Sequence, residues 1–226
     1  MDTNQQLIDF LSKYVTENRF DLFNKIIKNR TSYITVVLED IYQSQNASAV
    51  LRTCDCFGVQ DIHIIENRNQ FDVNPEVSLG SSKWLSLHRY NEKEDNTQSA
   101  ITKLKADGYR IVATTPHSND VNLEEFDLSA GKCAFVFGTE LKGISETVKA
   151  NADVFLKIPM YGFTESFNIS VSAAIILHHL THQLRSLDLH WQLNDIERNE
   201  LMVQWLKVSI KESDFLIDSF LNERSS

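Results

Sequence analysis

The sequence is poor in cysteine, proline and glycine, and it lacks any long apolar run. Its 226 residues include three cysteines, Cys54, Cys56 and Cys133, an odd number without the spacing of zinc ligands. This pattern argues against a disulfide framework and indicates reduced thiols. No apolar stretch approaches the length of a transmembrane helix, and the polar start MDTNQQ is unlike a signal peptide. We therefore expect a cytoplasmic chain with no membrane partner and no bound metal.

Three histidines, His178, His179 and His182, lie close together. The first and the last are four residues apart, which would place both on one face of a helix and would suit a pair of metal ligands. A zinc hydrolase, however, needs a glutamate where His179 stands. We prefer a surface or interface role for these histidines, with metal binding as the alternative.

Acidic residues dominate the chain, although not its N-terminal part. The formal net charge is −9, which argues against a nucleic-acid partner. Residues 91–128 and residues 188–226 each carry eight acidic and four basic side chains, whereas residues 13–30 carry five basic and two acidic ones. An acidic partner would therefore bind the N-terminal segment, although a charged helix face is more often only a solvated face.

Apolar runs of strand length alternate with helical patterns through most of the chain. The expected strands are residues 34–40, 61–66, 85–90, 109–116, 132–138 and 154–160. Several are nearly continuous in apolar character, which is typical of parallel strands buried on both faces. Helices are expected from Asn46, as an N-cap, to Gly58, at residues 97–107, and from Ser145 onward. We predict an α/β domain with a mostly parallel, six-stranded sheet.

Helical segments flank this domain on both sides. Residues 3–30 have the pattern of two short amphipathic helices that are too short to fold alone. Asn194 to Glu197 resemble a capping box, from which a helix is expected to run through Trp205 toward Phe220. The predicted segments are residues 1–30, 31–187 and 188–226.

A long apolar helix follows the last expected strand. It begins near Ser166 and is apolar on almost every side from Ile169 to Leu177, which predicts a helix that is buried all round. Its first turn, from Ser166 to Asn168, would lie outside the carboxyl end of a strand, where ligands bind in open α/β sheets. Ser166 and Asn168 are therefore candidates for ligand contacts, and capping of the helix is the alternative.

A second candidate stretch runs from Asn46 to Arg52. Side chains of a helix lean toward its N-terminus, so the long side chain of Arg52 would reach the same edge of the sheet. The alternative is an ion pair of Arg52 with Asp55 or Glu39.

A third candidate stretch, from Phe137 to Gly143, reads Phe-Gly-Thr-Glu-Leu-Lys-Gly. Its two glycines, Gly138 and Gly143, indicate a close approach of the backbone to a ligand. The stretch lacks the Lys-Ser/Thr pair of a phosphate loop and holds Glu140, which would repel a phosphate. A neutral or cationic ligand is therefore expected.

Taken together and in this order, the three stretches resemble the TrmH branch of the SPOUT methyltransferases. The shared patterns are Asn46 with Arg52, Phe137-Gly-Thr-Glu-Leu-Lys-Gly-Ile-Ser145, and Ile158-Pro-Met followed by Ser166-Phe-Asn-Ile-Ser170. The likeness covers about residues 31–187, and it departs at Gln45, where the family often has a basic residue or histidine. The resemblance implies a sheet with a C-terminal trefoil knot, S-adenosylmethionine as the cofactor, and a homodimer with active sites at its interface.

The resemblance also implies roles for individual residues. Catalytic roles are implied for Arg52, Asn46, Glu140, Asn168 and Ser166. Cofactor contacts are implied for Thr114, Phe137, Gly138, Thr139, Glu140, Gly143, Ile158, Met160, Ser166, Phe167 and Ser170. Contacts with RNA are implied for Arg19, Lys25, Lys28, Arg30 and Arg185. Because a guanidinium does not readily give up its proton, we expect Arg52 to stabilise a developing alkoxide rather than to act as a base.

The usual reaction of the family is methylation of a ribose 2′-hydroxyl in RNA. Relatives that modify the tRNA wobble ribose begin almost at the first strand, and those that modify rRNA carry a longer N-terminal domain. The helical segments on both sides of this domain resemble those of enzymes that methylate the D-loop guanosine, guanosine 18, of tRNA. The alternatives are another ribose, in 23S rRNA or at the wobble position, and a catalytically silent RNA-binding SPOUT protein.

Overall fold

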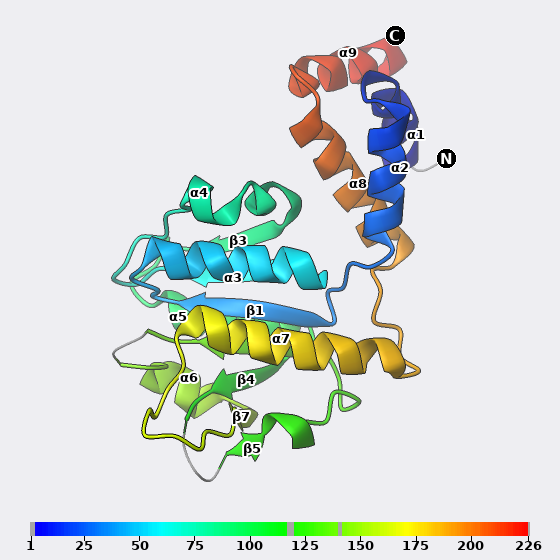
Figure 1. The fold of residues 1–226 in the computed structure, drawn as a ribbon. Helices are drawn as coiled ribbons and strands as arrows, with labels where there is room; N and C mark the ends of the chain where they lie inside the picture. Colours follow the sequence, from blue (N-terminus) through cyan, green and yellow to red (C-terminus); the bar gives the residue numbers. More distant parts are fainter. Residues whose placement is uncertain (1–2, 117–119, 140–141, 226) are drawn as a thin grey trace. The chain divides into compact units, whose positions relative to one another are not determined.

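The computed structural model describes residues 3–116, 120–139 and 142–225 (Figure 1). They belong to two compact units. The sheet unit is the continuous segment Thr31–Trp191, and the terminal unit combines Met1–Arg30 with Gln192–Ser226. The helical segments that were expected as two separate extensions therefore share one unit.

A seven-stranded sheet forms the centre of the sheet unit, with the strand order β3-β2-β1-β6-β4-β7-β5. The strands are β1 (Ile34–Glu39), β2 (Asp61–Ile65), β3 (Ser86–Tyr90), β4 (Arg110–Thr114), β5 (Val121–Asn122), β6 (Cys133–Phe137) and β7 (Val154–Lys157). All neighbouring strands are parallel, with Val36 of β1 opposite both Ile62 and Phe135. The carboxyl ends of the strands therefore collect along one edge, where ligands bind in such sheets.

The predicted number of strands is wrong by one. The additional strand, β5, has two residues, which pair with Leu156 and Lys157 of β7 at the end of the sheet. Two residues are too few to produce an alternating pattern, so the sequence does not distinguish β5 from the surrounding loop. The predicted parallel α/β architecture agrees with the structure.

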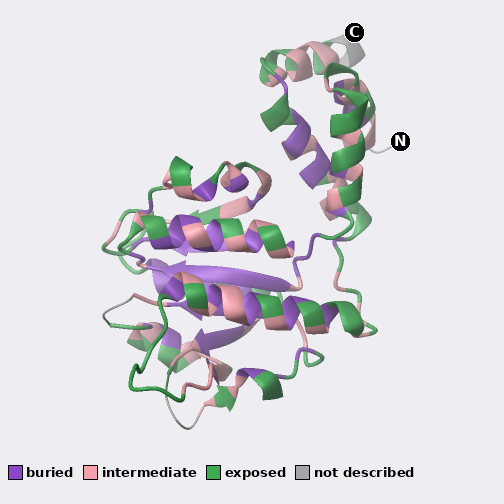
Figure 2. Cartoon of the chain, in the orientation of Figure 1, coloured by how far each residue is buried: buried purple, intermediate pink, exposed green. Residues whose placement is uncertain are grey.

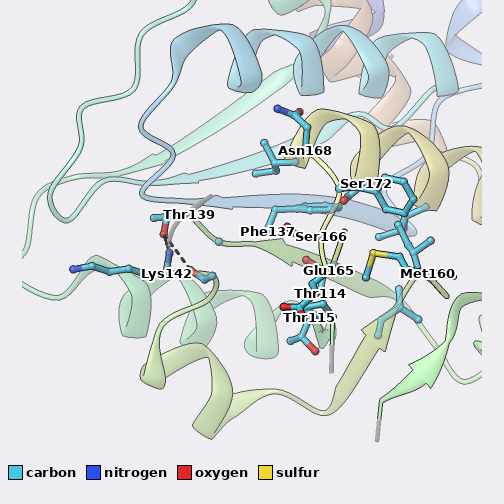
Figure 3. Close-up of a pocket in the computed structure, with 18 residues that line it drawn as sticks. Thr114, Thr115, Phe137, Thr139, Lys142, Met160, Glu165, Ser166, Asn168 and Ser172 are labelled. Atoms are coloured by element: carbon cyan, nitrogen blue, oxygen red, sulfur yellow. Dashed lines mark hydrogen bonds between the residues drawn. The ribbon is translucent and has the colours of Figure 1, made fainter. Parts of the chain in front are cut away.

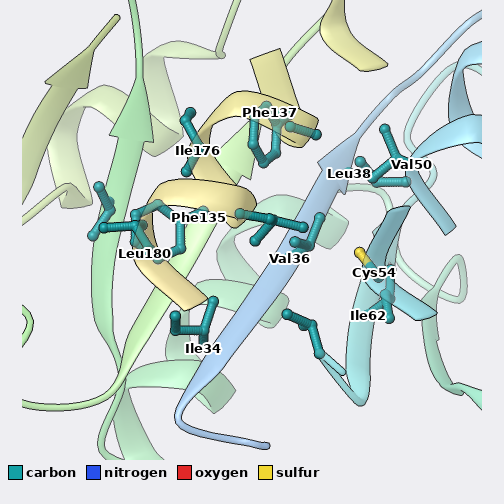
Figure 4. Close-up of a cluster of buried hydrophobic side chains, with 14 of the residues drawn as sticks. Ile34, Val36, Leu38, Val50, Cys54, Ile62, Phe135, Phe137, Ile176 and Leu180 are labelled. Atoms are coloured by element: carbon teal, nitrogen blue, oxygen red, sulfur yellow. The ribbon is translucent and has the colours of Figure 1, made fainter. Parts of the chain in front are cut away.

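Helices cover both faces of this sheet. They are α3 (Ser44–Phe57), α4 (Pro75–Ser78), α5 (Asn96–Ala106), α6 (Glu146–Asn151) and α7 (Ile169–Ser186), with single 3₁₀ turns at Ser81–Trp84 and Leu123–Glu125. Ile34, Val36 and Leu38 of β1 point to one face, where they pack with α3 and α7 (Figure 4). Val37 points to the opposite face, where it packs with α5 and α6. Burial of β1 on both faces explains its continuous apolar sequence.

Helix α7 differs from its prediction in two respects. It begins at Ile169 rather than near Ser166, because the Asn168 side chain accepts the Ser170 N–H at 2.9 Å and caps the helix. It is also buried along one side only (Figure 2). Val171, on another side of the helix, is 44% exposed. An apolar sequence does not by itself determine how much of the surface of the helix is buried by the rest of the same chain.

The terminal unit consists of helices. They are α1 (Thr3–Leu11), α2 (Glu17–Ile27), α8 (Asp195–Ser209) and α9 (Ser213–Ser225), with a 3₁₀ turn at Ser12–Tyr14. Its core centres on buried Trp205, whose ring lies 5.5 Å from that of Phe23. Asn194 begins α8 with the expected capping box. The expected continuation of this helix toward Phe220 is wrong, because Glu212 adopts a left-handed conformation (φ 57°) that separates α8 from α9.

Candidate active site

A cavity of about 560 Å³, which we call the first cavity, lies at the carboxyl edge of the sheet (Figure 3). It is bounded by the ends of β4, β6 and β7 and by the segment that leads into α7. Nine predicted cofactor residues line it, namely Thr114, Phe137, Gly138, Thr139, Gly143, Ile158, Met160, Ser166 and Phe167. Ser170 is not among the described lining residues, and its hydroxyl donates to Asn168 Oδ1 at 2.6 Å. The second and third motifs thus meet around one cavity.

The turn after β6 closes on itself beside this cavity. Thr139 and Gly143 exchange two backbone hydrogen bonds, with N···O distances of 3.0 and 2.9 Å. A Cβ atom at Gly138 would lie 2.2 Å from the carbonyl oxygen of Gly143, and Gly143 itself has a φ of +67°. The turn therefore requires glycine at position 138, and the φ of Gly143 favours glycine there. Glu140, which was expected to act in catalysis and cofactor binding, lies outside the described residues.

A buried carboxylate binds Ser145, which follows this turn. Glu39 ends β1, and its oxygens accept hydrogen bonds from the Ser145 N–H (2.9 Å), the Ser145 hydroxyl (2.7 Å) and the Thr97 hydroxyl (2.7 Å). Ser145 in turn caps α6. The sequence analysis considered Glu39 only as a possible partner of Arg52. The signal for its actual position is that a glutamate directly ends a strand buried on both faces.

A hydrogen bond joins the first motif to the third. The Asn168 amide donates to Asn46 Oδ1 at 3.1 Å, and the Asn46 amide donates to Gln43 Oε1 at 3.0 Å. Asn46 is 8% exposed and does not cap α3 as expected. The Ala47 N–H already donates to the Gln43 carbonyl (3.2 Å), so the first helical turn begins before Asn46. Asn46 and Asn168 are far apart in the sequence, but they are direct neighbours in the structure.

Arg52 lies apart from this pair. Six residues along a helix amount to about one and two-thirds turns, so Arg52 points to a different side of α3 from Asn46. Its side chain is exposed. The Glu39 carboxylate binds Ser145 and Thr97 instead, and the alternative pairing of Arg52 with Asp55 stays a prediction. Arg52 is also not among the described residues that line the first cavity. Within one chain, Arg52 is therefore not part of the described lining that holds Asn168.

The residues expected to contact RNA differ in their availability. Arg19, Lys25 and Lys28 are exposed on or just after α2. Arg30 is only 3% exposed, and its guanidinium lies 5.3 Å above the ring of Trp205. Its burial speaks against the expected surface contact, and the physical reason is that Trp205 supplies a stacking partner in the core of the terminal unit.

Arg185 is exposed but already engaged. Its guanidinium donates to the carbonyl oxygens of Thr181 (2.8 Å) and Phe57 (3.0 Å), and it lies 5.4 Å above the ring of Trp191. These contacts tie the end of α3 to the end of α7. An RNA contact by Arg185 would have to use guanidinium N–H groups that already donate to these carbonyl oxygens.

The first cavity offers apolar surface and few charges. Phe137, Ile158 and Met160 supply the apolar part, and the charged side chains among its described lining residues are Lys142 and Glu165. Figure 3 shows Lys142 extending away from Met160. Lys142 and Glu165 have opposite formal charges, so the expectation of a neutral or cationic ligand stays a prediction.

Several lining residues were not predicted. They are Thr115, Pro116, Lys142, Leu156, Glu165, Ile169, Ser172 and Ile176. Most of them lie directly beside the predicted residues along the chain. Ser172 and Ile176 are the exceptions, because they lie on successive turns of α7 and reach the cavity only through the direction of that helix.

Two classes of feature are absent from the described part of the chain. Within it, no helix is long and apolar enough to cross a membrane. Within the same residues, no group of three or more His, Cys, Asp and Glu side chains could hold a metal ion.

The sequence matches the SpoU rRNA Methylase family over residues 33–178. It is 43% identical over 215 residues to the tRNA (guanosine(18)-2'-O)-methyltransferase of Borreliella burgdorferi, an alignment that covers 95% of this chain and 96% of that protein. The crystal structure of the A. aeolicus TrmH/SpoU tRNA modifying enzyme is similar with a TM-score of 0.77 and 27% identity, covering 87% of this chain and 98% of that one. The fold also resembles the Streptomyces viridochromogenes SpoU methyltransferase AviRb in complex with AdoMet, with a TM-score of 0.60, 21% identity, and coverage of 72% and 65%.

Proposed function

Because the chain belongs to the SpoU rRNA methylase family, we propose that it transfers a methyl group from S-adenosylmethionine to the ribose 2′-hydroxyl of guanosine 18 in tRNA. The observation that carries this proposal is the 43% identity to an enzyme of that name, which extends over 95% of the chain. The alignment is therefore long enough to include most of the terminal unit as well as the motifs. We place the enzyme in the cytoplasm, in keeping with its free cysteines.

The first cavity would hold the cofactor. S-adenosylmethionine has no phosphate, carries a sulfonium cation and presents an adenine ring. Phe137 and Ile158 offer apolar surface for the ring, and Glu165 tolerates a cation. When bound, the cofactor supplies an electrophilic methyl group. The chain supplies the alignment of the acceptor and the removal of its proton.

The two asparagines would position the acceptor ribose. Asn168 is held at both ends of its amide, because Oδ1 accepts from Ser170 and Nδ2 donates to Asn46. An amide nitrogen carries two hydrogens, so Asn168 has a second N–H with a fixed direction. We assign this donor to an oxygen of the acceptor ribose. Ser166, which is exposed at the cavity, would contribute a further polar contact.

Arg52 would stabilise the ribose oxygen as its proton leaves. A guanidinium with a pKa above about 12 remains charged and favours a developing alkoxide next to it. Because Arg52 lies away from the first cavity of its own chain, we propose that the enzyme acts as a homodimer in which a second copy supplies Arg52. The half-exposed apolar residues Phe167 and Val171 would then be covered by that copy. We further propose the trefoil knot of SPOUT enzymes for the segment around α7, and tRNA contacts for Arg19, Lys25 and Lys28.

The test is transfer of labelled methyl groups to an unmodified tRNA transcript, followed by nuclease digestion and mass spectrometry. We expect 2′-O-methylguanosine at position 18. Arg52→Ala should abolish turnover and leave cofactor affinity within a few-fold, and Arg52→Lys should restore a part of the rate. The affinity for tRNA should fall steeply with salt. Methylation of another RNA ribose would refute the substrate, and cofactor binding without transfer to any RNA would refute the activity.

A further inference from the structure

A second cavity of about 1030 Å³ adjoins the first. Thr139, Lys142 and Gly143 line both cavities, so the turn after β6 forms a wall that the two cavities share. The second cavity is also bounded by the loop after β1, the loop after β2, and the first turns of α5 and α6. It therefore lies at the carboxyl edge of the sheet, on the other side of the turn that borders the proposed cofactor site.

Most of the carboxylates around the second cavity already have partners. Each of four binds a hydroxyl, a backbone N–H or an ammonium group within the chain, and these are Glu39, Asp40, Asp95 and Glu146. Asp40 is an example of a carboxylate that is held in place by the backbone. Its Oδ1 accepts from the N–H groups of Asn67 (2.7 Å) and Arg68 (2.9 Å), and its backbone is left-handed, with a φ of 52°.

Four charged or aromatic side chains around the same cavity remain without such partners among the described residues. Arg68 and Lys142 form no ion pair there, and Glu94 forms neither an ion pair nor a hydrogen bond. Tyr42 is 76% exposed and packs on no described ring. An aromatic face, two cations and one carboxylate thus face a single space.

These four groups match the parts of a guanosine nucleotide. An exposed aromatic ring stacks on a nucleobase whatever its sequence, and the cations attract phosphates. Guanine presents two adjacent donors, N1–H and N2–H, on its Watson–Crick edge, and a carboxylate accepts both. Adenine, cytosine and uracil lack this pair of donors.

We propose that the second cavity receives the guanosine whose ribose is methylated, with Tyr42 stacking on the base and Glu94 reading its Watson–Crick edge. Arg68 and Lys142 bind the flanking phosphates. This assignment rests on the proposed function, because the acceptor ribose must meet the cofactor beside the turn that the two cavities share. It adds a source of guanine specificity that the three motifs do not contain.

The first test separates stacking from other roles of Tyr42. Tyr42→Ala should raise KM for tRNA at least about tenfold, a loss of about 1.4 kcal/mol, while cofactor affinity measured by calorimetry stays unchanged. Tyr42→Phe keeps the ring and should behave like the unaltered enzyme. The inference is overturned if Tyr42→Ala leaves KM unchanged, or if it weakens cofactor binding as much as tRNA binding.

The second test addresses Glu94 with a tRNA that carries inosine at position 18, which lacks the N2 amino group. The unaltered enzyme should prefer guanosine over inosine, and Glu94→Gln should remove most of this preference. Glu92→Gln, at an exposed neighbour that does not line either described cavity, should keep it. An equal preference in Glu94→Gln and the unaltered enzyme would overturn the role of Glu94.

These outcomes are distinct from failure of the proposed function. If the unaltered enzyme transfers no methyl group to any tRNA, the proposed function fails and this assignment fails with it. If the unaltered enzyme methylates guanosine 18 while both sets of variants behave normally, the function stands and the second cavity is not the acceptor site.

Discussion

Removal of the Glu39 carboxylate should loosen the turn that separates the two cavities. Glu39 accepts three hydrogen bonds, two from Ser145 and one from Thr97, and it is 3% exposed. A hydrogen bond to a charged group contributes about 1.5–3 kcal/mol net. Because water that enters the vacated space satisfies some of the donors, we expect Glu39→Ala to lower the free energy of unfolding by about 3–5 kcal/mol.

Glu39→Gln provides the matched comparison. Its carbonyl oxygen still accepts the Ser145 N–H, and the hydroxyls of Ser145 and Thr97 can rotate to accept from the new amide. The loss should therefore be only about 1–2 kcal/mol. Urea unfolding followed by circular dichroism measures both values.

The functional part of this prediction concerns cofactor affinity. Ser145 ends the segment that begins at Gly138, so its release should also disorder the wall of the first cavity. Glu39→Ala should weaken cofactor binding about tenfold or more, equivalent to about 1.4 kcal/mol, and Glu39→Gln by much less. The reasoning is refuted if Glu39→Ala stays within about 1 kcal/mol of the unaltered protein in stability and binds the cofactor equally well.

Three further predictions follow from buried or strained positions. Gly138→Ala should abolish cofactor binding measured by calorimetry, because its Cβ would meet the backbone of Gly143 at 2.2 Å, and normal binding would contradict the closed turn. Burial, helped by a second imidazole beside it, lowers the pKa of His63 to about 4. His63 therefore takes up its proton near pH 6.5 in the unfolded chain but not in the folded one, so the free energy of unfolding should fall by roughly 2–3 kcal/mol between pH 6.5 and 4.5. In urea titrations His63→Leu should lose less stability over this range. An equal loss would refute the assignment. Iodoacetamide should label the exposed Cys56 rapidly and spare Cys133, whose pKa burial raises to about 11, and equal labelling detected by peptide mass spectrometry would contradict that burial.

The sequence predicts those parts of the fold whose cause is local. β1 is recognisable because both of its faces are buried, so the apolar run from Ile34 to Leu38 has no interruption. The turn after β6 is recognisable because a Cβ atom at Gly138 would meet the backbone of Gly143, which itself has a φ that favours glycine. In both cases a few neighbouring residues contain the whole signal.

The parts that the sequence does not predict depend on distant partners. Arg30 lies in a basic segment and is therefore expected at the surface. Its burial depends on Trp205, which lies near the other end of the chain. The hydrogen bond between Asn46 and Asn168 joins residues that lie 122 positions apart in the sequence. For Glu39, the sequence shows a charged residue at the end of a buried strand but does not identify Ser145 as its partner.

The assembly of the terminal unit from both ends of the chain affects how the protein is made. Helices α1 and α2 are synthesised first, whereas Trp205, which completes their core, is synthesised after the 161 residues of Thr31–Trp191. At about 5–20 residues per second, translation of that segment takes roughly 8–30 s. During this interval the apolar side chains of Leu7 and Leu11 have no partner in α8, and the sheet unit, as one continuous segment, is completed before α8 is synthesised. The first helices to leave the ribosome are therefore among the last to fold, and they would need protection from association until α8 follows.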